Sequence, residues 1–275
     1  MIGGGTMGAG IAQTLLEAAD RVTVVEATPS LAEAAYGRIV EGLGRRFKRA
    51  HDPDADVAAA LSRLELRVDL PPRVDPELVI EAVPESFGLK RRVLTEVDAS
   101  YPELPLLASN TSSLSITGLA AALRAPERFL GMHFFNPVPI SELVEIVAGT
   151  ATSTAAIETA QAWAHSIDKH AIVVRDSPGF ATSRLGLALG LEAIRMVEAG
   201  VATVEDIDTG MVLGYRHPIG PLRLTDLVGL DVRLGIAEHL AVTLGPRFEP
   251  PELLRTLVVE GKLGKKSGQG FYTWA

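Results

Sequence analysis

The amino-acid sequence predicts an α/β fold with a mainly parallel, buried sheet, followed by a second, all-helical C-terminal domain. Three observations lead to this prediction. A glycine-rich turn opens a helix at the start of the chain, short β-branched runs alternate with helical stretches to about residue 174, and only helical periodicity follows Ser177-Pro178-Gly179. Alternating strands and helices are typical of βαβ units, whose strands are parallel. We therefore expect two domains, residues 1–176 and 177–275.

The length and composition agree with this organisation. A chain of 275 residues exceeds the usual single core of about 100–150 residues. The net charge of −8 is spread along the chain, which argues against nucleic acid as a partner. The absence of cysteine excludes disulfides and thiolate metal sites, and we expect no metal. Because we see neither a signal peptide pattern nor an apolar run of membrane-spanning length, we expect a cytoplasmic protein with no membrane partner.

The predicted elements follow from apolar spacing. The predicted strands are 21–26, 77–83, 106–109, 128–135, 143–147 and 171–174. The helices predicted around them, with apolar residues three and four apart, are 9–19, 29–49, 90–100 and 154–167. The helices predicted for the second domain are 180–199, 203–213, 231–243 and 252–260. Asp52-Pro53-Asp54 is expected to break the chain between elements.

The glycine turn is the first functional signal. In the pattern Gly3-x-Gly5-x-x-Gly8 the first glycine permits a tight turn, the second lets the backbone approach a pyrophosphate, and the third packs helix against strand. The helix N-terminus then presents free N–H groups to the anion. Alone, the triplet is explained as well by an ordinary turn, but a helix and strand follow it, which favours a Rossmann-type nucleotide site. The residues expected to bind the cofactor here are Gly3, Gly5, Thr6, Met7 and Gly8.

Glu26 ends the next predicted strand, 18 residues after Gly8, near the offset at which an acid reaches the adenosine ribose hydroxyls. A carboxylate there would repel a 2′-phosphate, which favours NAD over NADP as the cofactor. The alternative is a solvated strand end. Only Met1 and Ile2 precede Gly3, so either the recorded start is a few residues short or the first strand is unusually brief.

Polar residues follow two later strands. Ser109-Asn110-Thr111-Ser112-Ser113 comes at the C-terminal end of a strand, where open α/β sheets bind ligands. A polar helix cap before Ile116 explains the same residues without a ligand. His133 ends another strand among bulky apolar residues, and Glu142 and Glu145 follow it.

The histidine can be a packed core residue or a base. Oxidation of a hydroxyl needs a base to take the proton as hydride leaves, and a carboxylate bonded to the far ring nitrogen would fix the tautomer. The sequence alone does not show that His133 and Glu145 touch.

Nine segments in consistent order run along nearly the whole chain. They are Gly3–Gly8, Glu81-Ala-Val-Pro-Glu85, Ser109-Asn-Thr-Ser-Ser113, His133-Phe-Phe-Asn-Pro137, Leu143-Val-Glu145, Pro178-Gly-Phe180, Gly220-Pro221, Asp226-x-x-Gly229 and Gly268-x-Gly270-Phe-Tyr. With them the chain resembles the 3-hydroxyacyl-CoA dehydrogenase family, and most closely its 3-hydroxybutyryl-CoA dehydrogenase type.

The resemblance implies an NAD cofactor, an acyl-CoA substrate in the cleft between two domains, and a homodimer formed through the helical domain. It implies that His133 is the general base, that Glu145 orients it and that Ser112 binds the substrate oxygen. The further residues it implies are Glu85, Lys90 and Asn110 for the cofactor and Asn136 for the substrate. Arg45 and Lys48 fall in the region associated with CoA phosphates, although a solvated basic helix face explains them equally well.

One residue departs from the family pattern. The family usually has Asn where this chain has Ser183, in Phe180-Ala-Thr-Ser183-Arg184. A serine hydroxyl is shorter than an amide and offers one group in place of two, so substrate preference or activity is expected to shift. Two rival functions therefore stay open, a dehydrogenase of a non-thioester 3-hydroxy acid or sugar acid, and a catalytically weak paralogue that binds NAD(H).

Overall fold

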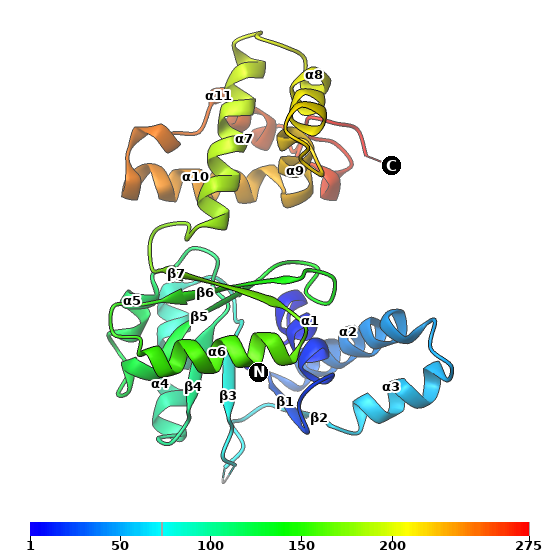
Figure 1. Ribbon diagram of the computed structural model, residues 1–275, viewed down its shortest axis with the longest axis vertical. Helices are drawn as coiled ribbons and strands as arrows, with labels where there is room; N and C mark the ends of the chain where they lie inside the picture. Colours follow the sequence, from blue (N-terminus) through cyan, green and yellow to red (C-terminus); the bar gives the residue numbers. More distant parts are fainter. Residues whose placement is uncertain (73, 275) are drawn as a thin grey trace. The chain divides into compact units, whose positions relative to one another are not determined.

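The computed structural model describes residues 1–72 and 74–274. These residues form two compact units, Met1–Asp176 and Ser177–Ala275 (Figure 1). The first is an α/β unit, and within the described residues the second contains helices and no named strand. The predicted fold class is confirmed.

The sheet of the N-terminal unit is mainly parallel. Its strands are β1 (Val22–Val25), β2 (Leu64–Arg67), β3 (Leu78–Glu81), β4 (Leu106–Ser109), β5 (Phe129–Phe134), β6 (Leu143–Ala148) and β7 (His170–Arg175). The order is β2-β1 in one part and β3-β4-β5-β6-β7 in the other, and only β5 and β6 pair antiparallel. Ile2 joins the two parts because its backbone bridges Val25 and Glu81.

Helices cover this sheet. They are α1 (Thr6–Leu15), α2 (Pro29–Phe47), α3 (Pro53–Leu61), α4 (Phe87–Ser100), α5 (Ile116–Ala120) and α6 (Thr154–Ser166). Helix α6 runs across β4, β5, β6 and β7 (Figure 1). Every residue of β4 and β5 is buried, as expected of strands covered on both faces. The predicted break at Asp52 falls between α2 and α3, where its carboxylate accepts the Ala55 N–H at 3.2 Å and caps α3.

The C-terminal unit packs its helices around an apolar core of their own. They are α7 (Thr182–Glu198), α8 (Val204–Thr209), α9 (Pro221–Val228), α10 (Leu230–Leu244) and α11 (Glu252–Val259). The segment predicted as a helix over 203–213 is helical, but its hydrogen-bonding pattern changes: α8 ends at Thr209 and continues directly into a π-helical turn between Gly210 and Gly214. Buried Asp226 holds the C-terminal segment by accepting hydrogen bonds from the Phe271 and Tyr272 N–H groups and from Trp274 Nε1.

Candidate active site

The glycine turn leaves the N-terminus of α1 open. Gly3 has a φ of +88°, which a residue with a side chain rarely adopts, and a Cβ on Gly8 would lie 1.9 Å from the Gly3 carbonyl oxygen. Gly5 precedes α1 without a side-chain cap, and a Cβ there would meet nothing within 4 Å. The first N–H groups of α1 therefore have neither a cap nor a bulky neighbour, and this cradle fits a pyrophosphate.

Glu26 belongs to this turn. Its Oε1 accepts the Gly4 N–H at 2.6 Å and its Oε2 accepts the Ala27 N–H at 3.2 Å. Each carboxylate oxygen has a second lone pair, so the side chain retains acceptor capacity for a ribose hydroxyl. Glu26 is half-buried against the glycine turn, which differs from the solvated strand end considered from the sequence.

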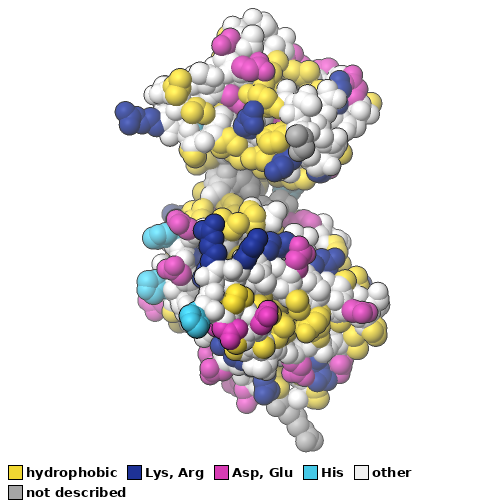
Figure 2. Space-filling view, turned by 90° about the vertical axis from the view of Figure 1, so that its right-hand side faces the viewer, with side chains coloured by type: hydrophobic (Ala, Val, Ile, Leu, Met, Phe, Trp, Pro, Cys, Tyr) yellow, Lys and Arg dark blue, Asp and Glu magenta, His cyan; other side chains and the backbone are white. Residues whose placement is uncertain are grey.

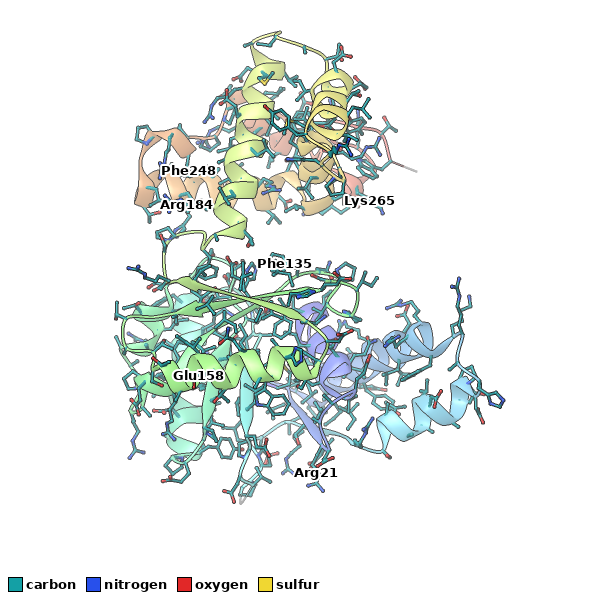
Figure 3. The ribbon with its side chains drawn as sticks, in the orientation of Figure 1. Arg21, Phe135, Glu158, Arg184, Phe248 and Lys265 are labelled. Carbon is teal, nitrogen blue, oxygen red and sulfur yellow. The ribbon has the colours of Figure 1, made fainter. Side chains whose placement is uncertain are left out.

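His133 and Glu145 form a buried pair. The antiparallel register of β5 and β6 places them opposite each other, and His133 Nδ1 lies 3.0 Å from Glu145 Oε2. His133 is 7% exposed and Glu145 is 0% exposed. The ring of Phe135, at the end of β5, lies 4.5 Å from the imidazole between centroids (Figure 3). A carboxylate at Nδ1 favours the neutral tautomer with its proton on Nδ1 and its lone pair on Nε2.

Glu85 holds the loop that carries Ser112. Its Oε1 accepts the Thr111 hydroxyl at 2.5 Å, the Ser112 N–H at 3.1 Å and the Ser113 hydroxyl at 3.2 Å. Asn110 Oδ1 accepts the backbone N–H of Phe134 at 2.9 Å, which ties the same loop to the residue after His133. The carboxyl ends of β3, β4 and β5 thus bring Ser112 to the sheet edge at which His133 lies.

Lys90 is fully buried behind that loop. Its Nζ lies 2.7 Å from Glu81 Oε1 and 3.4 Å from Glu85 Oε2. Glu81 is also fully buried and accepts the Ser109 hydroxyl at 2.6 Å through its other oxygen. The role of Glu81 is not predicted from the sequence, although this residue belongs to one of the family motifs. The sequence signal that could have identified Glu81 is an acid at the end of an apolar strand, because a carboxylate buried there requires a partner.

A cavity of about 800 Å³ lies beside the glycine turn in the same unit. Thr6, Arg45 and Asn136 are among the predicted residues that line it. Buried Lys169 also lines it and donates to the Val138 and Ser141 carbonyl oxygens at 2.8 and 2.6 Å, which fixes the loop after Asn136. Lys169 is not predicted as a site residue, because nothing in the neighbouring sequence indicates that it is buried.

The basic residues of α2 are exposed. Several Lys and Arg side chains gather on one face of the N-terminal unit (Figure 2). Arg45 pairs with Glu41, and Arg46 pairs with Glu17 at 3.1 Å. Lys48 is exposed, follows the end of α2 and does not line the cavity.

Two other predicted residues are described by their own elements. Met7 packs partly buried against the core, and Ser183 lies in the first turn of α7 in the C-terminal unit.

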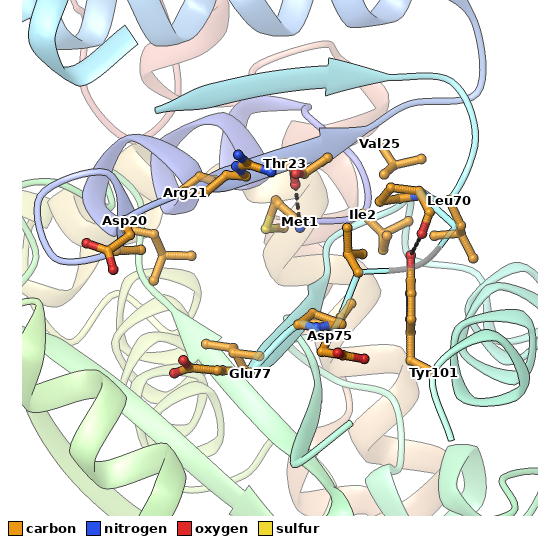
Figure 4. A pocket seen from close by; sticks show the side chains of 18 of the residues that line it. Met1, Ile2, Asp20, Arg21, Thr23, Val25, Leu70, Asp75, Glu77 and Tyr101 are labelled. Carbon is orange, nitrogen blue, oxygen red and sulfur yellow. Dashed lines mark hydrogen bonds between the residues drawn. The ribbon is translucent and has the colours of Figure 1, made fainter. Parts of the chain in front are cut away.

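A second cavity, of about 520 Å³, lies at the opposite end of the strands (Figure 4). The Met1 amine donates to the Thr23 carbonyl oxygen at 2.8 Å there, and burial lowers the pKa of this amine to about 5. The Tyr101 hydroxyl donates to the Pro71 carbonyl oxygen at 2.9 Å. None of the predicted site residues lines this cavity, because those residues follow the other ends of the parallel strands.

Neither a membrane-spanning helix nor a metal-binding cluster occurs in the described residues. No helix within residues 1–72 and 74–274 is long and apolar enough to cross a bilayer. Over the same residues, no group of three or more His, Cys, Asp or Glu side chains is placed to hold a metal ion.

Comparisons with known proteins agree with this geometry. Residues 1–177 match the family model "3-hydroxyacyl-CoA dehydrogenase, NAD binding domain", and residues 179–274 match the C-terminal domain of the same family. A 3-hydroxybutyryl-CoA dehydrogenase of Mycobacterium tuberculosis is 43% identical over all of this chain and 97% of its own length. The mitochondrial hydroxyacyl-coenzyme A dehydrogenase of Sus scrofa is 39% identical over all of this chain and 90% of its own length.

The fold is also similar to that of a solved structure over the whole chain. The crystal structure of (S)-3-hydroxybutyryl-CoA dehydrogenase PaaH1 from Ralstonia eutropha has a TM-score of 0.92 and 38% identity, covering all of this chain and 97% of that one. The family resemblance and the NAD cofactor predicted from the sequence are thereby confirmed. The chain belongs to the 3-hydroxyacyl-CoA dehydrogenase family and is a dehydrogenase that uses NAD.

Proposed function

We propose that this enzyme transfers a hydride between a short-chain 3-hydroxyacyl-CoA and NAD, with His133 as the general base. The observation that carries the proposal is the 3.0 Å contact between His133 Nδ1 and Glu145 Oε2. A base must hold its lone pair toward the substrate, and a buried carboxylate at Nδ1 keeps that lone pair on Nε2. The short acyl chain is supported by relatives named 3-hydroxybutyryl-CoA dehydrogenase.

In the proposed reaction His133 Nε2 takes the proton of the 3-hydroxyl group. NAD held by the glycine turn would supply the acceptor for the hydride from C3 of the substrate, whose C3–O single bond becomes a carbonyl. The charge that forms on the imidazole is stabilised by the carboxylate of Glu145. Ser112 hydrogen-bonds the reacting oxygen, and Glu85 holds its loop through the Ser112 N–H. In the reverse direction protonated His133 returns the proton to the oxygen.

We assign the cofactor and the CoA group to different parts of the N-terminal unit. Gly3, Gly5 and Gly8 accommodate the pyrophosphate of NAD, and Glu26 accepts a ribose hydroxyl. The proposed set of cofactor-binding residues is completed by Thr6, Met7, Glu85, Lys90 and Asn110. Because Lys90 is fully buried, its part is to hold Glu85 and the strand end rather than to expose its ammonium.

The cavity of about 800 Å³ described above, which α2 also lines, supports a CoA site. Arg45 and Asn136 line it, and Lys48 follows the same helix. Basic side chains suit the phosphates of CoA, which carry negative charge. Ser183, where the family has Asn, hydrogen-bonds the thioester carbonyl in this proposal.

We also propose a homodimer formed through the helical unit. Leu213 and Tyr215 are 75% and 76% exposed there, and the space-filling view shows further exposed apolar side chains on this unit (Figure 2). Contiguous apolar side chains left in water are typical of a subunit interface. The mass of the protein in solution, measured by light scattering, tests this point, and a monomer at micromolar concentration would contradict it. The cytoplasmic location stays a prediction.

A substrate assay tests the proposed reaction. Purified enzyme is mixed with NADH and either acetoacetyl-CoA or free acetoacetate, and NADH oxidation is followed by absorbance. We expect turnover of the thioester and much slower turnover of the free acid. Faster turnover of the free acid would favour a non-thioester substrate, and tight NADH binding without turnover of any acyl-CoA would favour the weak paralogue suggested by Ser183.

A further inference from the structure

Glu81 links the ends of two adjacent strands in the N-terminal unit. It ends β3 and is 0% exposed, so its side chain does not contact a ligand directly. Its Oε2 accepts the hydroxyl of Ser109, the last residue of β4, at 2.6 Å. Its Oε1 accepts the N–H of Val83, in the loop after β3, at 2.6 Å and lies 2.7 Å from Lys90 Nζ. One buried carboxylate thus holds the beginning of both loops at this edge of the sheet.

Lys90 extends this link to Glu85. It lies in the first turn of α4, and its Nζ donates to the Val83 carbonyl oxygen at 3.0 Å and lies 3.4 Å from Glu85 Oε2. The Glu85 side chain is 38% exposed, so packing alone does not fix its carboxylate. A buried ammonium is unfavourable without counter-charges, and this one lies between two carboxylates. The position of Glu85 therefore depends on Lys90, and that of Lys90 on Glu81.

Glu85 in turn fixes the loop after β4. Its Oε1 accepts the Thr111 hydroxyl, the Ser112 N–H and the Ser113 hydroxyl at 2.5, 3.1 and 3.2 Å. Because the backbone of Ser112 is held by this carboxylate, the direction of its side chain follows from the position of Glu85. The loop is thus held at its beginning by Glu81 directly and in its middle by Glu81 through Lys90 and Glu85.

We propose that Glu81 is a positioning residue for hydride transfer, which fixes the Ser112 hydroxyl where it meets the reacting oxygen of the substrate. The inference rests on the proposed function and adds to it a residue that touches neither substrate nor cofactor. A hydrogen bond to the reacting oxygen matters most in the transition state, where charge develops on that oxygen. Misplacement of Ser112 should therefore lower kcat more than it raises KM.

A double variant separates positioning from stability. Glu81→Gln alone leaves the Lys90 ammonium without its closest counter-charge, so an unstable unit would also explain a loss of activity. Glu81→Gln combined with Lys90→Met removes both charges and keeps side chains of similar size, so the midpoint of urea unfolding should return close to that of wild type. We expect its kcat for acetoacetyl-CoA with NADH to stay at least about tenfold below wild type, with KM changed less than about threefold.

Asp98→Ala is the matched control for lost stability. Asp98 is also a buried acid of this unit, 6% exposed, and accepts the Arg124 N–H at 2.6 Å. It follows Lys90 by eight residues, which is about 12 Å along α4 and away from the loops at the sheet edge. Its removal leaves a backbone N–H without its acceptor and should lower the unfolding midpoint without lowering kcat. A loss of kcat in the double variant no larger than in Asp98→Ala would overturn the inference.

A second comparison uses Ser112→Ala, in which the hydroxyl to be positioned is gone. Adding Glu81→Gln and Lys90→Met to this variant should lower kcat by less than about threefold further, because both changes act on the same step. A further loss of about tenfold would overturn the inference, since the buried network would then act on another group. A wild-type enzyme that does not turn over acetoacetyl-CoA would instead contradict the proposed function.

Discussion

Nδ1 of His133 lies 3.0 Å from Oε2 of Glu145 across the single antiparallel strand pair of the described sheet. The pair is closed off from water, since His133 is 7% and Glu145 0% exposed. In such surroundings the carboxylate fixes both the tautomer and the orientation of the ring.

Glu145→Gln should keep the fold but lose most of the activity. The glutamine amide does not carry the charge that stabilises the imidazolium, and its NH₂ group can place a donor against Nδ1 and so select the wrong tautomer. We expect kcat with acetoacetyl-CoA and NADH to fall by about 100-fold or more, with little change in the Kd for NADH. Glu158→Gln on α6, an exposed acid, is the control (Figure 3). Activity within threefold of wild type in Glu145→Gln would show that Glu145 does not orient the base.

Glu26→Gln should relax the choice of cofactor. Glutamine keeps an oxygen that accepts the Gly4 N–H, so the glycine turn is retained, while the charge that repels a 2′-phosphate is removed. We expect the ratio of kcat/KM for NADH over NADPH to fall by about tenfold, which corresponds to about 1.4 kcal/mol. Glu33→Gln, an exposed acid in the first turns of α2, measures any general effect of charge. An unchanged ratio would exclude Glu26 from the ribose site.

Glu81→Gln should destabilise the N-terminal unit, because Lys90 would stay buried without its closest counter-charge. Breaking a buried pair from one side costs about 3–5 kcal/mol, and urea unfolding measures the loss. Adding Lys90→Met should restore much of the stability, since the uncompensated charge is then gone. Glu260→Gln breaks the exposed pair with Lys262 and should cost less than about 1 kcal/mol. Equal losses from Glu81→Gln and Glu260→Gln would contradict this account.

The sequence predicts most of the sheet but misses strand β2. Its four residues alternate apolar and polar, Leu64-Glu65-Leu66-Arg67, which is typical of a half-buried strand, but so short an alternation is a weak signal. Helix α3 starts at the predicted break, because Asp52-Pro53 ends one element and also caps the next. In the second unit α9 has only eight residues and begins at Pro221, directly after Gly220, and Gly-Pro is typical of a turn.

The candidate site, like the fold, can be predicted from the sequence only in part. The residues of the site are recognisable from motifs, but their contacts are not. His133 and Glu145 meet because β5 and β6 are antiparallel. The prediction of a mainly parallel sheet does not specify which two strands pair antiparallel. Glu81 and Lys169 cannot be identified as site candidates from the sequence, because their importance depends on burial, which comes from packing between elements distant in the sequence.

The most direct test of the account is the replacement of His133 with Asn, since His133 as the general base is its central claim. Asn offers a donor toward Glu145 but has no titratable nitrogen. The account predicts that kcat for acetoacetyl-CoA reduction falls by at least about 100-fold, while the Kd for NADH, measured by fluorescence, stays within twofold of wild type. His165→Asn on α6 should match wild type in both measurements. A His133→Asn enzyme that retains wild-type kcat would contradict the account.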